Sequence, residues 1–177
     1  FKFLEKSGTI RTAPIENVGS PRVKKNTPQP LPDALVRELL RQPDKYPTPE
    51  ARRDKAMLEL LYASGMRISD MMSLDVDDVH LDGDLVSFVV KGSRVQNATV
   101  SLRYVTSLKK YMDESRPQLV RHKNERALFL NRLGERLTRQ GLWQIMKTYA
   151  KEAKLDGEVT LRALRQSFLA NTPKAKA

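Results

Sequence analysis

The chain has 177 residues, of which 40% are apolar, enough for one folded domain and too many for wholesale disorder. Its 32 Lys and Arg residues outnumber 21 Asp and Glu residues, and the resulting net charge of +11 favours nucleic acid over a membrane surface as the partner. Because the chain has no Cys and two isolated His residues, the sequence excludes disulfides and Cys-based zinc sites and offers no ligand spacing for a His-based metal site.

The first residues, FKFLEKS at 1–7, are typical of the end of a helix, and Gly8 follows as a stop signal. A start without Met, at the end of a helix, predicts that the chain is part of a longer protein. Residues 12–32 then hold five of the ten prolines, with Lys24 and Lys25 among them. Since proline fixes φ and removes backbone donors, we expect an extended linker here, which either follows a phosphate backbone or is a solvated tether.

Two helices are predicted after the linker. Residues 32–42, PDALVRELLRQ, form an amphipathic pattern with the leucines on one face. Thr48, Pro49 and Glu50 then combine a capping side chain, a proline at the first helical position and an acid in the first turn. This combination predicts the start of a second helix.

That second helix, at 51–64, carries a buried apolar stripe, and Gly65 can take the left-handed conformation that ends it. Arg67 follows in a short corner, and Ser69 is expected to cap the next helix, at 69–74. An arginine in such a rigid corner suits a phosphate group. Considered alone, the corner also fits a surface arginine in a turn between two helices.

Five aspartates within residues 75–84 invite a metal interpretation, but their spacing lacks the central Gly and the final Glu of a calcium loop. We therefore expect a solvated loop there. Residues 85–90, LVSFVV, and residues 98–102 flank the turn KGSR and predict a small antiparallel hairpin. Lys91 lies at the end of its first strand and Arg94 in its turn.

The second half of the chain predicts three helices and one short extended segment. Apolar stripes of helical spacing occur at 104–114, 138–154 and 160–170, and residues 127–130 are expected to be extended. Trp143 is expected to pack in the core rather than to stack on bases. The predicted fold class is mainly α with a small antiparallel β-sheet (α+β).

Three basic sites could act on one phosphate: Arg67, Lys91, and the pair Arg162 and Arg165, which are neighbours on one helix face. Two guanidiniums can each donate a pair of hydrogen bonds to non-bridging oxygens, and they stabilise a pentacoordinate transition state without a metal. A lysine on a hairpin can donate a proton to the leaving oxygen. Residues 103–154, with 13 basic and 5 acidic side chains, concentrate positive charge after the hairpin.

These motifs together resemble the tyrosine recombinases, the family of phage integrases and Xer-type enzymes. GMRISD resembles the motif around the first catalytic arginine of the family, and VVKGSR resembles the hairpin of its catalytic lysine, here 24 residues after Arg67. VTLRALRQSF resembles the box that usually holds a His and an Arg, and ALFLNRLGERLTRQGLWQIMKTYAKEAKL resembles the stretch before that box. The resemblance extends from about residue 1 to residue 168.

The resemblance implies a tyrosine-recombinase catalytic-domain fold for residues 32–177. It also implies that residues 1–18 are the end of a helical core-binding domain and that residues 19–31 are a basic, Pro-rich linker. In the family the two domains form a C-shaped clamp around duplex DNA.

The resemblance further implies that Arg67 and Arg165 clamp the phosphate and that Lys91 is the general acid for the departing 5′ oxygen, with no cofactor and no metal. Arg162 stands where the family usually has His. An arginine can still donate to a phosphate oxygen, but it cannot act as a base near neutral pH.

The nucleophile of the family is a tyrosine beyond the second arginine, whereas the five tyrosines of this chain all precede Arg165. Two hypotheses follow. The parent protein is a site-specific DNA recombinase or integrase that cleaves and rejoins strands through a phosphotyrosine, and this chain lacks the nucleophile. Alternatively, the chain is a non-catalytic DNA-binding module derived from a degenerate or truncated integrase.

Both hypotheses predict double-stranded DNA as the partner, and the aromatic share of 6% argues against a single-strand binder. Lys24, Lys25, Arg94 and Arg139 are expected to contact phosphates, and Arg139 and Gln140 open a helix that the resemblance places at the major groove. The parent is expected to be a tetramer on DNA and this chain alone a monomer. No apolar run is long enough to span a bilayer, and we expect a cytoplasmic, nucleoid-associated protein.

Overall fold

The computed structural model describes residues 2–9, 29–82, 85–89, 97–101, 106–155 and 159–171. Their α-helices are α1 (Lys2–Lys6), α2 (Asp33–Arg41), α3 (Pro49–Ser64), α4 (Ile68–Ser73), α5 (Thr106–Lys110), α6 (Arg116–Leu119), α7 (Arg139–Glu152) and α8 (Leu161–Asn171). Short 3₁₀ turns are η1 (Gln42–Lys45) and η2 (Val76–Asp78), η4 (Tyr111–Ser115) is π-helical, and the strands are β1 (Val79–Asp82), β2 (Leu85–Val89) and β3 (Asn97–Ser101). The predicted class, mainly α with a small antiparallel sheet, is confirmed.

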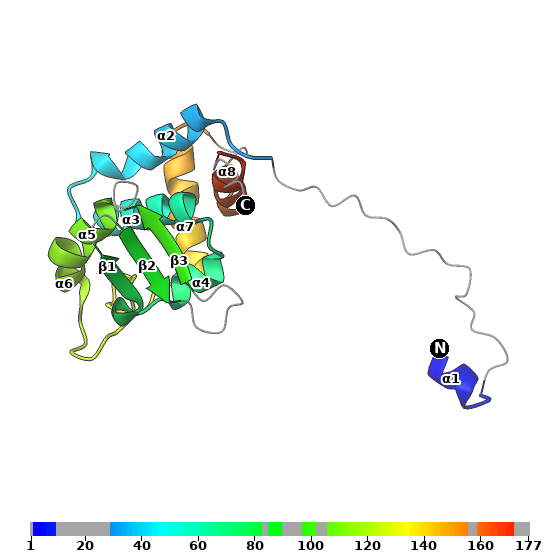
Figure 1. Cartoon of the computed structure of the whole chain (residues 1–177). Helices are drawn as coiled ribbons and strands as arrows, with labels where there is room; N and C mark the ends of the chain where they lie inside the picture. The colour runs from blue at the N-terminus through cyan, green and yellow to red at the C-terminus, as the bar shows by residue number, and fades with distance from the viewer. Residues whose placement is uncertain are drawn as a thin grey trace.

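Helix α3 lies at the centre of the fold. It contacts α2, α5, α6, α8 and β3, and Figure 1 shows the sheet in front of the helical body that surrounds it. Of the predicted apolar stripe, Ala56, Met57, Leu60 and Leu61 are buried and Ala63 is half-buried, and Leu58 beside them is buried as well. Because other elements cover α3 from several sides, its buried surface is wider than one stripe.

The ends of α3 form as their residues predict. Thr48 Oγ1 accepts a hydrogen bond from the backbone N–H of Ala51 at 3.1 Å, which caps the first turn. Gly65 ends the helix at φ 59°, and its N–H donates to Leu61 O at 3.2 Å. Likewise Gly8, at φ 74°, follows α1 as the sequence predicts. A residue with a Cβ would be strained at such angles.

The sheet has the order β1-β2-β3, and both pairs of neighbouring strands are antiparallel. Val86 and Phe88 of β2 are buried, Ser87 between them is half-buried, and Leu85 and Val89 on either side are exposed, the alternation expected of a sheet with one face on the core. The predicted hairpin is therefore confirmed in its two strands. Lys91 and Arg94 lie outside the described residues.

The expectation of a solvated loop at residues 75–84 is wrong for the residues that the structure describes. Val79–Asp82 form strand β1, and the turn before it is closed by a capping box in which Asp75 and Asp78 each bond the other's backbone. Asp78 is buried, and Asp77 and Asp75 pair with Arg126 and Arg136. The cations that hold these carboxylates come from far along the chain, so local spacing did not indicate them.

The residues of the predicted helix at 104–114 that the structure describes are helical, but the helix changes from α to π at Tyr111 and continues to Leu119. Helix α5 ends at Lys110 and the π-helical turn η4 follows, in which the N–H of Arg116 reaches back to Tyr111 O. Pro117 has no N–H for the bond that would continue a regular helix, which accounts for the wider turn. Tyr111 is fully buried, donates to Leu128 O at 3.0 Å and stacks on Phe129 at 5.7 Å between ring centroids.

The last two helices agree with their predicted ranges, but one expectation about α7 is wrong. Thr138 caps α7 by accepting from Gly141 N at 3.0 Å, and Leu142, Met146 and Tyr149 pack into the core. Trp143, expected in the core, is 44% exposed. It lies one position away from the buried stripe, at the surface beside Ile68 of α4 and the first residues of α8. No helix among the described residues is long and apolar enough to cross a membrane.

Candidate active site

The corner after α3 is held by backbone and hydroxyl contacts. Ser64 Oγ donates to Leu60 O at 2.7 Å and accepts from Met66 N at 3.2 Å, on either side of the left-handed Gly65. Arg67 then precedes α4 in an extended conformation. These contacts fix the direction in which the chain leaves α3. They therefore also fix the point at which the Arg67 side chain leaves the backbone.

Ser69 does not cap α4, which corrects the sequence-based expectation. The helix begins one residue earlier, because the N–H groups of Asp70 and Met71 donate to Arg67 O at 2.9 and 3.0 Å. Arg67 is therefore the capping residue, without a side-chain cap, and Ser69 lies inside the first turn. The sharp turn at Gly65 leaves only three residues between the helices, Gly65, Met66 and Arg67, so α4 starts directly after Arg67.

The Arg67 guanidinium is oriented by a carboxylate of its own helix. Its Nε donates to Asp70 Oδ2 at 2.8 Å, while the Arg67 side chain is 54% exposed. This hydrogen bond, together with the charge of Asp70, raises the pKa of Arg67 above its usual value. The cation at the corner is therefore permanent and held in place at the surface.

Arg165 reaches the same corner from a segment 100 residues away. Its Nε donates to Gly65 O at 2.6 Å, and α8 packs against α3. The contact uses one of the five N–H donors of a guanidinium. The two arginines singled out in the sequence therefore meet around the single turn from Gly65 to Arg67.

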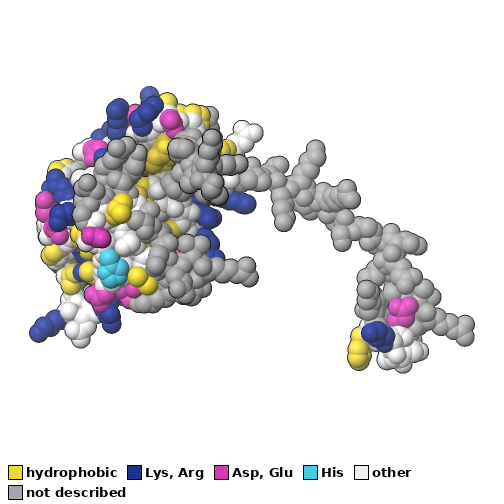
Figure 2. Space-filling view, viewed as in Figure 1, with side chains coloured by type: hydrophobic (Ala, Val, Ile, Leu, Met, Phe, Trp, Pro, Cys, Tyr) yellow, Lys and Arg dark blue, Asp and Glu magenta, His cyan; other side chains and the backbone are white. Residues whose placement is uncertain are grey.

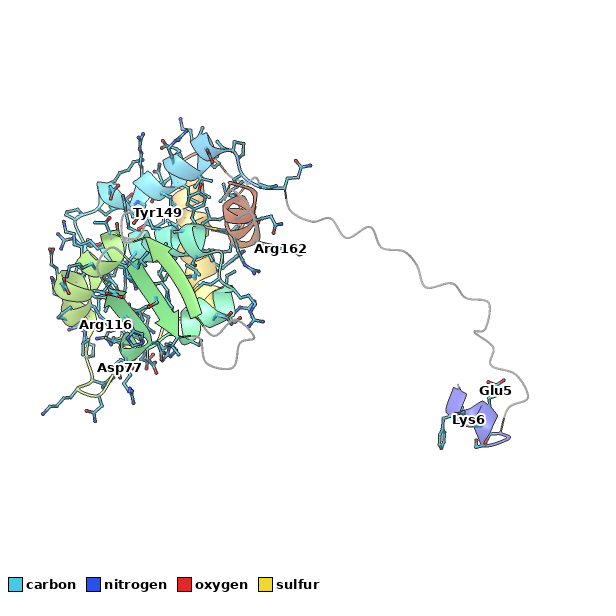
Figure 3. All side chains as sticks on the ribbon, in the orientation of Figure 1. Glu5, Lys6, Asp77, Arg116, Tyr149 and Arg162 are labelled. Carbon is cyan, nitrogen blue, oxygen red and sulfur yellow. The ribbon has the colours of Figure 1, made fainter. Side chains whose placement is uncertain are left out.

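Arg162 lies on the first turn of α8, one turn before Arg165. Thr160 caps this turn by accepting from Ala163 N at 3.0 Å, and Arg162 is exposed, whereas Arg165 is half-buried. Figure 3 shows the Arg162 side chain projecting from α8 at the surface of the folded body. The structure thus brings Arg67, Arg162 and Arg165 to one end of the α3–α8 contact.

Arg136 stabilises the far end of α4, the helix that begins at this corner. Its Nη1 donates to Met72 O and Leu74 O, both at 2.9 Å, and its Nη2 binds Asp75. These are carbonyls at the end of α4, which α4 itself leaves without partners. Arg136 therefore fixes the helix that starts at Arg67, a role that the sequence did not indicate.

The remaining candidate residues divide into two groups. Arg139 and Gln140 are exposed on the first turn of α7, which contacts α4. Lys24, Lys25, Lys91 and Arg94 lie outside the described residues. On the face drawn in Figure 2, Lys and Arg side chains are interspersed with Asp and Glu. Within the described part of the chain, no three His, Asp or Glu side chains gather as they would around a metal ion.

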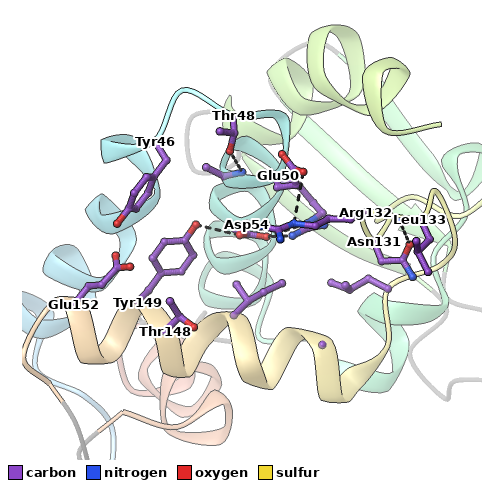
Figure 4. A pocket seen from close by; sticks show the side chains of 15 residues that line it. Tyr46, Thr48, Glu50, Asp54, Asn131, Arg132, Leu133, Thr148, Tyr149 and Glu152 are labelled. Atoms are coloured by element: carbon purple, nitrogen blue, oxygen red, sulfur yellow. Dashed lines mark hydrogen bonds and ion pairs between the residues drawn. The ribbon is translucent and has the colours of Figure 1, made fainter. Parts of the chain in front are cut away.

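A buried polar cluster, which sequence reasoning missed, joins α3 to α7. Arg53 donates through Nε and Nη2 to Asp54 Oδ1 at 2.9 and 2.7 Å and through Nη1 to Leu130 O at 2.6 Å, and the Tyr149 hydroxyl donates to Asp54 Oδ2 at 3.0 Å. Figure 4 shows the cluster in a cavity of about 630 Å³ between the two helices. A signal was present, because Arg53 and Asp54 continue the buried stripe of α3 one turn towards its start.

With this geometry established, comparison with known proteins identifies the class. A model of the phage integrase family matches residues 31–175, and the chain belongs to this family. The tyrosine recombinase XerC of Roseiflexus sp. (strain RS-1) is 45% identical over 179 residues, covering 100% of this chain and 57% of that protein. The tyrosine recombinase XerD of Lacticaseibacillus casei is 32% identical over 168 residues, covering 95% and 57%. The resemblance seen in the motifs is thus confirmed, and the chain spans a little over half the length of these relatives.

Solved structures give the same fold. The XerH site-specific recombinase bound to palindromic difH substrate aligns with a TM-score of 0.71 at 22% identity, over 90% of this chain and 46% of that one. A lambda integrase dimer bound to a COC' core site aligns with a TM-score of 0.68 at 16% identity, over 95% and 47%. At such identities the likeness establishes the architecture alone, and it confirms the tyrosine-recombinase catalytic-domain fold.

Proposed function

We propose that this chain supplies the phosphate-binding part of a site-specific DNA recombinase that cleaves and rejoins strands through a phosphotyrosine. The observation that carries the proposal is the hydrogen bond from Arg165 Nε to Gly65 O at 2.6 Å, which joins the two motif arginines at one corner. The relatives named as tyrosine recombinases support the same assignment.

In the proposed reaction, Arg67 and Arg165 donate to the non-bridging oxygens of the scissile phosphate and stabilise the charge of the transition state. A tyrosine hydroxyl loses its proton to water as its oxygen forms a bond to phosphorus, the bond to the 5′ oxygen breaks, and Lys91 gives that oxygen its proton. Arg162 adds a third guanidinium. No step requires a metal or a cofactor.

The tyrosines of this chain do not suit the role of nucleophile. All five precede Arg165 in the sequence. Tyr111 and Tyr149 are buried and donate to Leu128 O and Asp54, which ties them to the core. DNA binding without cleavage is therefore the second candidate function, and Arg162 in place of the usual His favours it.

Partners and setting follow from the same proposal. The DNA is double-stranded, with Lys24, Lys25, Arg94 and Arg139 at its phosphates and Gln140 at a base edge. The parent acts as a tetramer on DNA in the cytoplasm, at the nucleoid, and this chain alone is a monomer. Residues 1–18 belong to a core-binding domain and residues 19–31 to a linker.

Cleavage is tested with the intact gene product and a nicked duplex that carries a site selected by this protein from a random-sequence library. We expect a covalent protein–DNA adduct that survives denaturing electrophoresis. Arg67→Ala and Arg165→Ala should each abolish the adduct, whereas Arg132→Ala, at a side chain that is 85% exposed and 3.7 Å from Glu50, should leave it unchanged. An intact product that binds the site but yields no adduct would establish the binding-module alternative.

DNA binding by the chain itself is tested through its salt dependence. Logarithmic affinity should fall linearly with logarithmic salt concentration, with a slope of about −0.9 for each phosphate neutralised. Arg67→Gln and Arg165→Gln should each make the slope shallower by about 1, and Arg132→Gln should not. Fluorescence anisotropy of a labelled duplex measures this, and salt-independent binding would contradict the proposal.

A further inference from the structure

The exposed face of α7 carries a feature that the proposed phosphate clamp does not use. Leu142, Met146 and Tyr149 bury one side of the helix, and Trp143 lies at the border of that buried side, with the exposed Lys147 one turn further on. At 44%, the exposed fraction of Trp143 is high for the largest apolar side chain in a protein. Arg139 and Gln140 precede Trp143 on the same side at helical spacing.

Trp143 also forms one wall of a surface hollow of about 530 Å³. The start of α8 contributes Thr160, Leu161 and Arg162 to this hollow, and α4 contributes Ile68. Ile68 directly follows Arg67, and Arg162 lies one turn from Arg165, so the hollow adjoins the proposed phosphate site. The described side chains that line it include Arg139 and Arg162 and no carboxylate, which suits a polyanion.

Lys147 determines which part of the indole can bind another group. Its Nζ lies 4.7 Å from the centroid of the Trp143 ring, a cation–π contact that holds the ring on the helix surface. A base cannot stack on the ring face that the ammonium covers. The rest of the indole surface can still make an apolar contact with another group, next to the hydrogen-bond donors of Arg139 and Gln140.

We propose that Trp143 is a specificity-determining residue that packs against the 5-methyl group of a thymine in the major groove. The thymine methyl is the apolar group that the groove displays, and Gln140 and Arg139 suit the polar edges of the neighbouring bases. The proposal rests on the proposed function, because it requires duplex DNA lying across Arg67 and Arg165.

The first test uses the wild-type chain, because Trp143 is its single tryptophan. Titration with duplex DNA should change the intrinsic tryptophan emission over the same concentrations at which a labelled duplex gains anisotropy. If DNA binds but the emission stays unchanged, the proposed role of Trp143 is overturned, while the proposed function still stands. Absence of any binding in the anisotropy measurement would overturn the proposed function, and this proposal with it.

The second test removes only the methyl group. In a duplex selected by the chain from a random-sequence library, each thymine is replaced in turn by uracil, and affinity is measured for the wild-type chain and for Trp143→Ala. At one position the wild-type chain should lose about fourfold in affinity, the effect of removing one buried methyl group. Trp143→Ala should bind the thymine and uracil duplexes equally well at that position.

Tyr46→Ala is the matched control, because Tyr46 is an aromatic side chain that is 43% exposed and lies outside this hollow. It should keep the wild-type preference for thymine. A Trp143→Ala variant that keeps the same preference would overturn the proposal. If Trp143 had only a structural role, Trp143→Ala would lower the affinities for the thymine and uracil duplexes by the same factor. The preference for thymine would then remain, and this result would also overturn the proposal.

Discussion

The buried Arg53, Asp54 and Tyr149 show how single polar side chains are accommodated in the core. Burial raises the pKa of the Asp54 carboxyl, and the charge and hydrogen bonds of Arg53 oppose that shift. Burial also raises the pKa of the Tyr149 hydroxyl, with the Asp54 charge as the next cause, so Tyr149 stays protonated and donates to Asp54. Each group is acceptable in the core because the other two are present.

Two substitutions separate what the Asp54 charge and the Tyr149 hydrogen bond each contribute to the free energy of unfolding. Asp54→Asn leaves the Arg53 charge buried without a counter-charge and should lower the free energy of unfolding by about 3–5 kcal/mol. Tyr149→Phe removes one hydrogen bond to a charged group and should cost about 1–3 kcal/mol. Urea unfolding followed by circular dichroism measures both, and equal losses would contradict this order.

Tyr111 gives the fold a dependence on alkaline pH. Burial raises its pKa from 10.0 to about 12, so the folded state keeps a proton that the unfolded chain loses. Its contribution to stability is complete below pH 10 and is lost as the pH rises through 12, with a magnitude of about 3 kcal/mol at most. The difference in unfolding free energy between wild type and Tyr111→Phe should narrow or reverse over this interval. A difference that is constant with pH would refute the assignment.

At the scale of elements, the turn between α3 and α4 combines a stability role with a binding role. Gly65→Ala forces a Cβ into the left-handed region and should destabilise the fold by about 1–2 kcal/mol. Because Arg165 binds the Gly65 carbonyl, the same change should also weaken binding to duplex DNA. Gly65→Asn should lose less in both measurements, since Asn tolerates this conformation. Urea unfolding and anisotropy titrations compare the two variants.

Periodicity and capping chemistry predicted most elements of the fold, including α3, α7, α8 and the hairpin strands. They failed where distant residues decide the outcome. Strand β1 alternates Val, His, Leu and Asp, but the many aspartates of residues 75–84 favoured a loop in the sequence. In the structure, Arg126 and Arg136 pair with Asp77 and Asp75. Trp143 was misplaced because its type favours burial while its position on α7 faces outward.

At the scale of the whole molecule, the arginines of the candidate site could be selected from motifs, but their meeting could not be derived from spacing. Arg67 and Arg165 come together because α8 packs on α3. The resemblance implied that both arginines bind one phosphate, but neither it nor local patterns gave this contact. Arg136 and the Arg53 cluster escaped sequence reasoning because their partners are distant in the chain. Arg136 binds the carbonyls of Met72 and Leu74, and Arg53 binds the carbonyl of Leu130.

The hydrogen bond between Leu31, which lies just before α2, and Ser167 of α8 can report whether α8 is packed in place. The buried N–H of Leu31 donates to Ser167 Oγ at 2.7 Å, and Ser167 donates in turn to Ala163 O at 2.9 Å. Leu31 is therefore shielded from solvent deuterium only while α8 is docked, since its acceptor is a side chain of that helix. The exchange rate of this one amide reports how often the contact between Leu31 and Ser167 opens, and every departure of α8 from α3, which would withdraw Arg165 from the corner at Gly65, contributes to that rate.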